Sequence, residues 1–150
     1  MFQRILVPTD GSASSRNAAH AAIELAKATG GTLVTIHVVP PAVPEALAGE
    51  SAAPVSGPVR LGPTAEAVAV QSDAALMDVE SQARMAGVRI TAEQVADFGA
   101  ADAIMDFAQA RQCDLIVMGA ERYNALMALV RGSTTQKVLA GSNVPVLVVH

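Results

Sequence analysis

The feature that most constrains the fold of this sequence is its alternation of short aliphatic runs with longer segments of helical periodicity. Residues 4–8 (RILVP) and 114–119 (DLIVMG) are almost continuously apolar, as is typical of strands buried on both faces. Residues 32–39 (TLVTIHVV) are rich in β-branched side chains, and residues 144–149 (VPVLVV) form the last such run. These runs predict a parallel sheet covered by helices, and therefore an α/β protein.

Amphipathic segments between the runs are predicted to be helices. Apolar residues from Ala18 to Ala26 recur every three or four positions, and Gly30 provides the stop. Thr64 is predicted to cap a second helix that ends at Gly87. The predicted inner face of that helix consists of Val68, Ala75, Leu76, Val79, Ala83 and Ala86.

The second half of the chain continues the alternation. Residues 88–95 are predicted to be a strand near a sheet edge, because apolar and polar residues alternate at its start. A third helix carries Ile104 and Phe107, and residues 133–141 form a short helix before the last strand. Since parallel neighbours require right-handed crossovers, we predict a flavodoxin-like (Rossmann-like), doubly wound, five-stranded parallel sheet with strand order 3-2-1-4-5.

Size and composition indicate one soluble domain over residues 1–150. The region from about residue 40 to 63 contains six of the eight prolines, which predicts a long flexible loop. Mean hydropathy is high at +0.37, but no apolar run approaches the roughly 20 residues of a membrane helix, so no membrane contact is expected. The start of the sequence lacks the features of a secretory signal, and a cytoplasmic location is expected.

The net charge, the aromatic content and the single cysteine argue against two features, nucleic acid binding and a disulfide within the chain. The net charge is −4, the ten basic residues are scattered, and only four aromatic residues are present, which argues against binding of polymeric nucleic acid. Cys113 is the only cysteine, so an intrachain disulfide is impossible, and we interpret it as a small buried hydrophobic residue.

Two loops are expected to meet where the winding direction reverses, between the first and fourth strands. Ligands bind beside this point because the loops at the carboxyl ends of the strands diverge there. One loop is formed by residues 8–12, and the other runs from Met118 to the helix start at residues 132–135 (GSTT). Free N–H groups, hydroxyls and the helix dipole at that start suit a phosphate, although simple N-capping by Ser133 explains the same residues.

In order and spacing, the sequence resembles the universal stress protein family over nearly its whole length. The matching segments are Ile5-Leu-Val-Pro-Thr-Asp10-Gly-Ser, His37-Val-Val, Asp114-Leu-Ile-Val-Met-Gly119, and Gly132-Ser through Val144-Pro-Val-Leu-Val-Val149. The resemblance implies a regulatory module of the stress response that binds ATP, or AMP or ADP, with Mg²⁺ as a further candidate. It implies slow or incidental hydrolysis at most.

The resemblance also assigns the nucleotide-binding residues. They are Pro8, Thr9, Asp10, Val38, Met118, Gly119, Arg122, Gly132, Ser133 and Thr134. By analogy, Asp10 lies near the ribose or adenine and can reach a nucleotide-bound Mg²⁺, while Thr9 and Val38 line the base pocket. From the residues alone, capping of the first helix is an equally good interpretation of Asp10.

Arg122 departs from the family pattern, in which nucleotide-binding members have Gly-x-x-Gly at the end of the fourth strand, nine further residues, and then Gly-Ser or Gly-Thr. This chain keeps Gly119 and Gly132 at the required spacing but has Arg122 in place of the second glycine. If the loop needs a positive φ there, arginine strains it by about 1 kcal/mol or more and obstructs the phosphate path. Alternatively, the guanidinium binds the phosphates directly. The alternative function is therefore a dimeric stress protein that does not bind nucleotide and acts through protein partners.

Two further expectations concern catalysis and assembly. The sequence has no nucleophile elbow and no Walker lysine, so no strong catalysis is expected, and His37 is interpreted as a packed, hydrogen-bonded histidine at a strand end. The last strand is aliphatic and is predicted at a sheet edge, which favours pairing with a second copy. The residues expected in this homodimer contact, which family members often use, are Val144, Val146, Leu147 and Val148.

Overall fold

A single parallel sheet organises the computed structural model, which describes residues 1–41, 65–120 and 134–150. Within these residues the sheet has five strands in the order β3-β2-β1-β4-β5, as predicted. The strands are β1 Arg4–Pro8, β2 Thr32–Val39, β3 Ile90–Ala96, β4 Leu115–Gly119 and β5 Val146–Val149. The doubly wound, flavodoxin-like class is thereby confirmed, with the winding reversal between β1 and β4.

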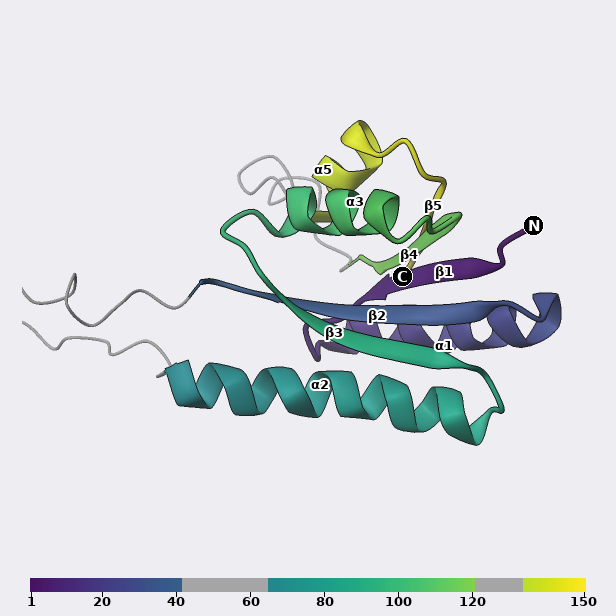
Figure 1. Cartoon of the computed structure of the whole chain (residues 1–150), viewed down its shortest axis with the longest axis horizontal. Coiled ribbons are helices and arrows are strands. Elements are labelled where there is room, and N and C mark those ends of the chain that lie inside the picture. The colour runs from purple at the N-terminus through teal and green to yellow at the C-terminus, as the bar shows by residue number, and fades with distance from the viewer. Residues whose placement is uncertain (42–64, 121–133) are drawn as a thin grey trace, which may run out of the picture.

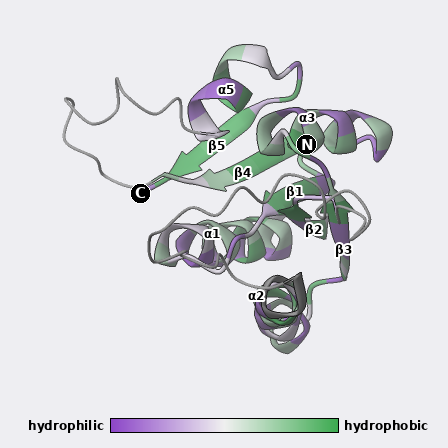
Figure 2. Cartoon of the chain, turned by 90° about the vertical axis from the view of Figure 1, so that its left-hand side faces the viewer, coloured by the Kyte–Doolittle hydropathy of each residue, from purple (hydrophilic) through white to green (hydrophobic). Residues whose placement is uncertain are grey.

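Helices cover both faces of the sheet (Figures 1 and 2). On one side lie α1 Ala13–Thr29 and α2 Ala65–Met85, and on the other lie α3 Ala100–Ala110 and α5 Thr134–Gly141. No helix within these described residues is both long enough and apolar enough to span a membrane.

The core divides into two clusters because successive strand residues point to opposite faces of the sheet. Ile5, Leu33 and Val117 pack on the α1 and α2 side, where α1 contributes small alanines. Leu6 and Ile116 belong to the opposite cluster with residues of α3 and α5. The apolar runs of β1 and β4 are therefore buried on both faces, as their sequence predicts.

Two predicted strand boundaries are wrong by two residues. The strand expected at 88–95 is β3, Ile90–Ala96, and the strand expected at 144–149 is β5, Val146–Val149. Val88 and Val144 are held in turns, whereas Arg89 and Pro145 already accept one hydrogen bond each from the neighbouring strand, from the N–H groups of Leu33 and Ile116. The predicted cap Thr64 and most of the loop expected at 40–63 lie outside the described residues.

The strand order brings the carboxyl ends of β1, β2 and β4 together at the left-hand end of the molecule in Figure 1. The first turns of α1, α3 and α5 begin at the same end, because each helix follows a strand or loop that leaves it. The candidate site lies between these elements.

Candidate functional site

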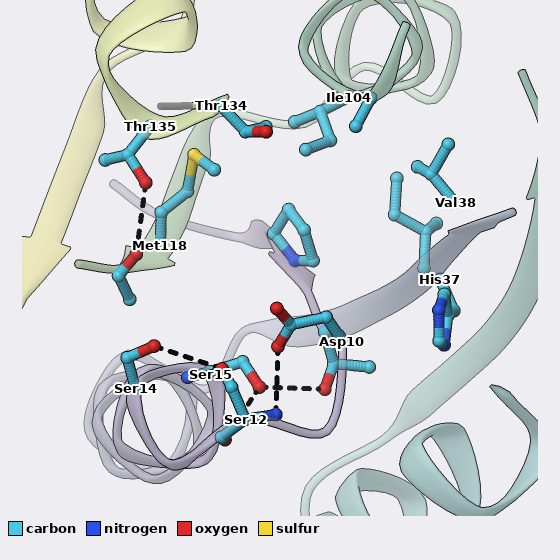
Figure 3. A pocket seen from close by; sticks show the side chains of 15 residues that line it. Asp10, Ser12, Ser14, Ser15, His37, Val38, Ile104, Met118, Thr134 and Thr135 are labelled. Atoms are coloured by element: carbon cyan, nitrogen blue, oxygen red, sulfur yellow. Dashed lines mark hydrogen bonds between the residues drawn. The ribbon is translucent and has the colours of Figure 1, made fainter. Parts of the chain in front are cut away.

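A cavity of about 210 Å³ lies at the carboxyl ends of β1, β2 and β4, bordered by α1, α3 and α5 (Figure 3). Seven of the ten predicted binding residues line it: Pro8, Thr9, Asp10, Val38, Met118, Gly119 and Thr134. The other three, Arg122, Gly132 and Ser133, lie outside the described residues. Thr134 and Asp10 share one cavity, so the loop after β1 and the helix start that follows β4 do converge.

The turn between β1 and α1 is fixed by its own backbone. The Thr9 N–H donates to the Ile36 carbonyl at 2.8 Å, so the strand pairing extends one residue past β1. Gly11 then adopts φ +77°, a conformation that side chains other than glycine rarely tolerate. Ser12 caps α1, its hydroxyl accepting from the Ser15 N–H at 3.2 Å.

Asp10 is held within this turn but is not the helix cap. Its Oδ1 accepts from the Ser12 N–H at 2.9 Å, and Figure 3 shows the second carboxylate oxygen pointing away from that bond. Partial burial by itself raises the pKa of the Asp10 carboxyl, but hydrogen bonds from Ser12 and Ser15 outweigh it and leave the pKa below its ordinary value. Asp10 is therefore an anion at neutral pH, with one oxygen available to a hydroxyl or a cation.

Hydroxyl groups line the wall formed by α1. Thr9 Oγ1 lies 3.3 Å from Ser15 Oγ, and Ser12 Oγ lies 3.0 Å from Ser14 Oγ (Figure 3). Thr9 and Ser15 are buried, whereas Ser12 and Ser14 are half-buried. A hydroxyl both donates and accepts, so this wall can bind either a sugar hydroxyl or an anionic oxygen.

The end of β4 packs directly against the first turn of α1. A Cβ at Gly119 would overlap with the backbone carbonyl of Ser14, so this contact admits only glycine. The Gly119 carbonyl accepts from Thr135 Oγ1 at 3.1 Å, which ties the start of α5 to the same point. Gly119 thus joins three walls of the cavity.

The opposite wall is apolar. Val38 from β2, Met118 from β4, and Ala100 and Ile104 from α3 line it, the last two one turn apart on the helix. Figure 3 shows Val38 and Ile104 near one another. Ile104 and Met118 are buried, and Val38 is half-buried. A slot of this composition suits a planar aromatic ring, because it offers contact area without charge.

His37 lines the cavity and differs from its prediction. Its Nδ1 is buried and has no hydrogen-bond partner among the described residues, so the expected hydrogen bond is absent at this nitrogen. Buried polar atoms are nearly always paired with protein or water.

Several lining residues were not predicted as binding residues. They are Ser12, Ser14, Ser15, Ile36, His37, Ala100, Ile104 and Thr135. Ser12 and Ser15 are one helical turn apart just after the first strand, and Thr135 lies in the predicted helix start. The positions of these three residues could therefore be predicted from the sequence. The positions of Ala100 and Ile104 could not, because only the packing of α3 over β2 places them there.

The described residues contain no group of three or more His, Cys, Asp or Glu side chains that could hold a metal ion. Among the described residues that line the cavity, Asp10 is the only one with a carboxylate. One carboxylate is too few for a protein-only Mg²⁺ site, although it suffices for a cation that a nucleotide also binds.

Comparison with known proteins places these features in a family. The model of the universal stress protein family matches residues 1–150. A universal stress protein of Thermus aquaticus is 34% identical over 150 residues, which cover all of both chains. A solved universal stress protein in complex with cAMP has a TM-score of 0.74 at 24% identity, covering 99% of this chain and 97% of the other. The structure of the Archaeoglobus fulgidus universal stress protein in complex with dAMP has a TM-score of 0.71 at 20% identity, covering both chains fully. The chain therefore belongs to the universal stress protein family.

Proposed function

We propose that this protein is a regulatory module that binds an adenine nucleotide in the cavity at the carboxyl ends of β1, β2 and β4. The observation that carries the proposal is the segregation of the cavity walls into an apolar slot, a carboxylate and a set of hydroxyls. This order along one cavity matches the order of base, sugar and phosphate in a nucleotide.

Each part of the ligand has a proposed partner. The base lies between Val38 and Ile104, and the ribose hydroxyls donate to the carboxylate of Asp10. The phosphates lie at the start of α5, where Thr134 offers a hydroxyl and the helix dipole favours negative charge. Arg122, Gly132 and Ser133, which lie outside the described residues, are proposed to contact the phosphates further along the chain.

The cavity volume favours the nucleoside part of the ligand. At about 210 Å³ it is smaller than the roughly 300 Å³ at which sites for drug-sized ligands begin. Related structures carry cAMP and dAMP, both adenine monophosphates, which supports this size class. ATP, ADP and AMP are all proposed ligands, with Mg²⁺ entering on the phosphates and reaching Asp10. We place this function in the cytoplasm.

Calorimetric titration of nucleotide-free protein with AMP, and with ATP and Mg²⁺, tests the proposal. We expect saturable binding, weakened about tenfold by Asp10→Asn, because a hydrogen bond to a charged group is worth roughly that factor. Asp106→Asn is the matched control, since Asp106 is exposed on α3 outside the cavity. No binding at millimolar nucleotide, or equal affinities for the two variants, would overturn the proposal.

The alternative function, a dimer that acts through protein partners without nucleotide, is favoured by the exposure of Leu147 on the edge strand β5. The variant Arg122→Gly separates the two functions. Under the alternative, this substitution creates nucleotide binding that the natural chain lacks. Under the main proposal, the natural chain binds and loss of the guanidinium weakens the affinity for ATP more than that for adenosine.

A further inference from the structure

A second cavity, of about 260 Å³, lies at the opposite end of the sheet from the first. It is formed at the amino ends of β1, β2 and β3 and at the end of α3, and it shares no lining residue with the nucleotide cavity. Three arginines line it, and Glu93 contributes the one carboxylate found among its described lining residues; the arginines are Arg4, Arg89 and Arg111. Three of the eight arginines of a chain with net charge −4 therefore surround one hollow.

The alternation of side chains explains how this cavity forms. Thr32 projects to the same face as Val34, which belongs to the core cluster beneath α3. Thr91 and Glu93 share that face with Val95 of the same cluster. α3 packs against β2 on this side, and β3 runs beside it as the edge strand (Figure 1). The hollow lies between the edge of the sheet and the last turn of α3.

The arginines are only partly neutralised. Arg111 forms an ion pair with Glu93 at 2.5 Å and stacks over the Phe107 ring at 5.2 Å. Arg4 donates from Nη1 to the Arg111 carbonyl at 2.8 Å, and its guanidinium has no carboxylate partner among the described residues. The Arg89 carbonyl accepts from the Leu33 N–H at 2.8 Å, but the Arg89 guanidinium makes no hydrogen bond or ion pair with the described part of the chain. The charged lining residues therefore carry a formal charge of +2.

One further carboxylate, that of Asp114, lies beside the backbone of Arg4 and lowers the positive potential there without lining the cavity. Asp114 accepts the backbone N–H groups of Gln3 and Arg4 at 2.7 and 3.0 Å, and it is not among the residues that line the cavity. Guanidinium groups remain protonated at all physiological pH values, so the excess positive charge is permanent.

We propose that this cavity binds a phosphate group, either inorganic phosphate or a small phosphomonoester. The planar donor fork of arginine matches phosphate oxygens in two-pronged geometry, and Arg4 and Arg89 both have donors to spare. The exposed Thr91 side chain adds a hydroxyl at the wall. The small volume excludes a nucleic acid strand from the cavity itself.

Glu93 gives the proposal a directional test. Its carboxylate repels a bound phosphate and occupies the guanidinium of Arg111. Neutralising it removes the repulsion and frees a third arginine for the ligand. Glu93→Gln should therefore tighten phosphate binding, whereas a purely structural ion pair would give no gain.

Nuclear magnetic resonance of the ¹⁵N-labelled full chain resolves the two cavities. Inorganic phosphate is titrated at constant ionic strength against chloride, with the amide signals of Thr32, Arg89 and Thr91 reporting the proposed site. Thr134 and Thr135 report the nucleotide cavity separately. We expect saturable shifts at the first set in the millimolar range, whether or not the second set responds.

Variants complete the experiment. Arg89→Gln should weaken the binding about tenfold, since one charge-assisted hydrogen bond corresponds to roughly that factor, and Glu93→Gln should tighten it several-fold. The matched control is Arg84→Gln, because Arg84 is exposed on α2 and ion-paired with Glu80. Shifts that chloride reproduces, or an affinity equal in wild type and Arg89→Gln, would overturn the proposal. Tighter binding of glycerol phosphate than of inorganic phosphate identifies an ester as the ligand, and equal binding identifies the free ion.

Discussion

Asp10 lines the nucleotide cavity and also accepts a hydrogen bond from the N–H of Ser12, the residue that caps α1. Its pKa lies below the ordinary value of 3.8, so its hydrogen bonds stabilise the folded state above that value and are lost as the pH falls through the folded pKa. Asp10→Asn should lower the thermal midpoint at pH 7 by about 2–4 °C, as expected for a hydrogen bond worth about 1 kcal/mol. Melting curves of both proteins from pH 7 to well below 3.8 check this, and the difference should shrink in acid. A difference that stays constant down to the lowest pH would contradict the assigned cause.

Single residues also show where sequence reasoning succeeds and fails. Cys113 is buried as predicted, and burial raises the pKa of its thiol to about 11, so it remains protonated and inert. His37 is predicted to be packed and hydrogen-bonded because isolated histidines are seldom catalytic. The absence of a partner for its Nδ1 depends on how neighbouring elements pack around it, which no local pattern encodes.

At the scale of elements, the boundary between α2 and β3 shows why periodicity alone misplaces a strand. Gly87 takes φ +76° and donates to the Arg84 carbonyl at 3.0 Å, while the Val88 N–H donates to the Ala83 carbonyl at 2.9 Å. These two bonds form a Schellman ending, in which the hydrophobic residue after the glycine packs into the core. Val88 is buried for that reason and not because it lies in β3.

The start of β5 has a similar explanation. Ser142 Oγ accepts from the Val144 N–H at 3.0 Å and donates to the Val144 carbonyl at 2.8 Å. Val144 is therefore held in a turn, and hydrogen bonding to β4 begins at Pro145, whose carbonyl accepts from the Ile116 N–H at 2.9 Å. An aliphatic run marks where a strand can form, but competing side-chain bonds decide where it begins.

The close contact between Gly119 of β4 and Ser14 of α1 sets the distance between two walls of the nucleotide cavity, and a substitution at Gly119 tests its importance. Gly119→Ala places a methyl group against the Ser14 carbonyl, so α1 must shift away from β4 or the chain must strain. We expect a loss of about 1–3 kcal/mol in the free energy of unfolding, as for other overpacked sites, together with weaker nucleotide binding. Urea denaturation and calorimetry measure the two effects.

Gly99→Ala is the matched control for this substitution. Its added Cβ would lie 3.0 Å from the Asp102 carboxylate, which can move, and its φ of −114° is open to alanine. The two variants should therefore differ in stability. Equal stabilities would show that the close approach at Gly119 is not a constraint.

At the scale of the whole molecule, the strand order of the sheet can be predicted from the sequence because few strand orders are compatible with its pattern of elements. The alternation of elements and the right-handed crossover rule leave few ways to wind five strands, and one of them brings Asp10 and Thr134 to a common cavity. The arginine cavity arises by the same logic at the other end. Arg4, Arg89 and Arg111 are far apart in sequence but lie where strands begin and a helix ends. That shared location was readable in the sequence, whereas the unneutralised charge was not.

The edge of the sheet formed by β5 leads to a prediction about assembly. In the described residues β5 pairs with β4 alone, and Leu147 at its centre is 41% exposed. Val149, two residues further along β5, packs against the core cluster on the α1 side, so Leu147 projects to that face of the sheet. A second copy that adds its own β5 would satisfy the edge and cover Leu147, because an exposed aliphatic edge favours strand pairing.

We therefore expect a homodimer through β5, and Leu147→Glu should weaken it by at least about tenfold, because a charge would be buried at the centre of the contact. Sedimentation equilibrium over a range of protein concentrations measures the association. Met77→Glu is the matched control, since Met77 is 66% exposed on α2, away from the sheet edge. The control should remain dimeric with the wild-type affinity, whereas Leu147→Glu should sediment as a folded monomer. A wild-type monomer at every concentration, or the same loss of association in both variants, would contradict a homodimer through β5.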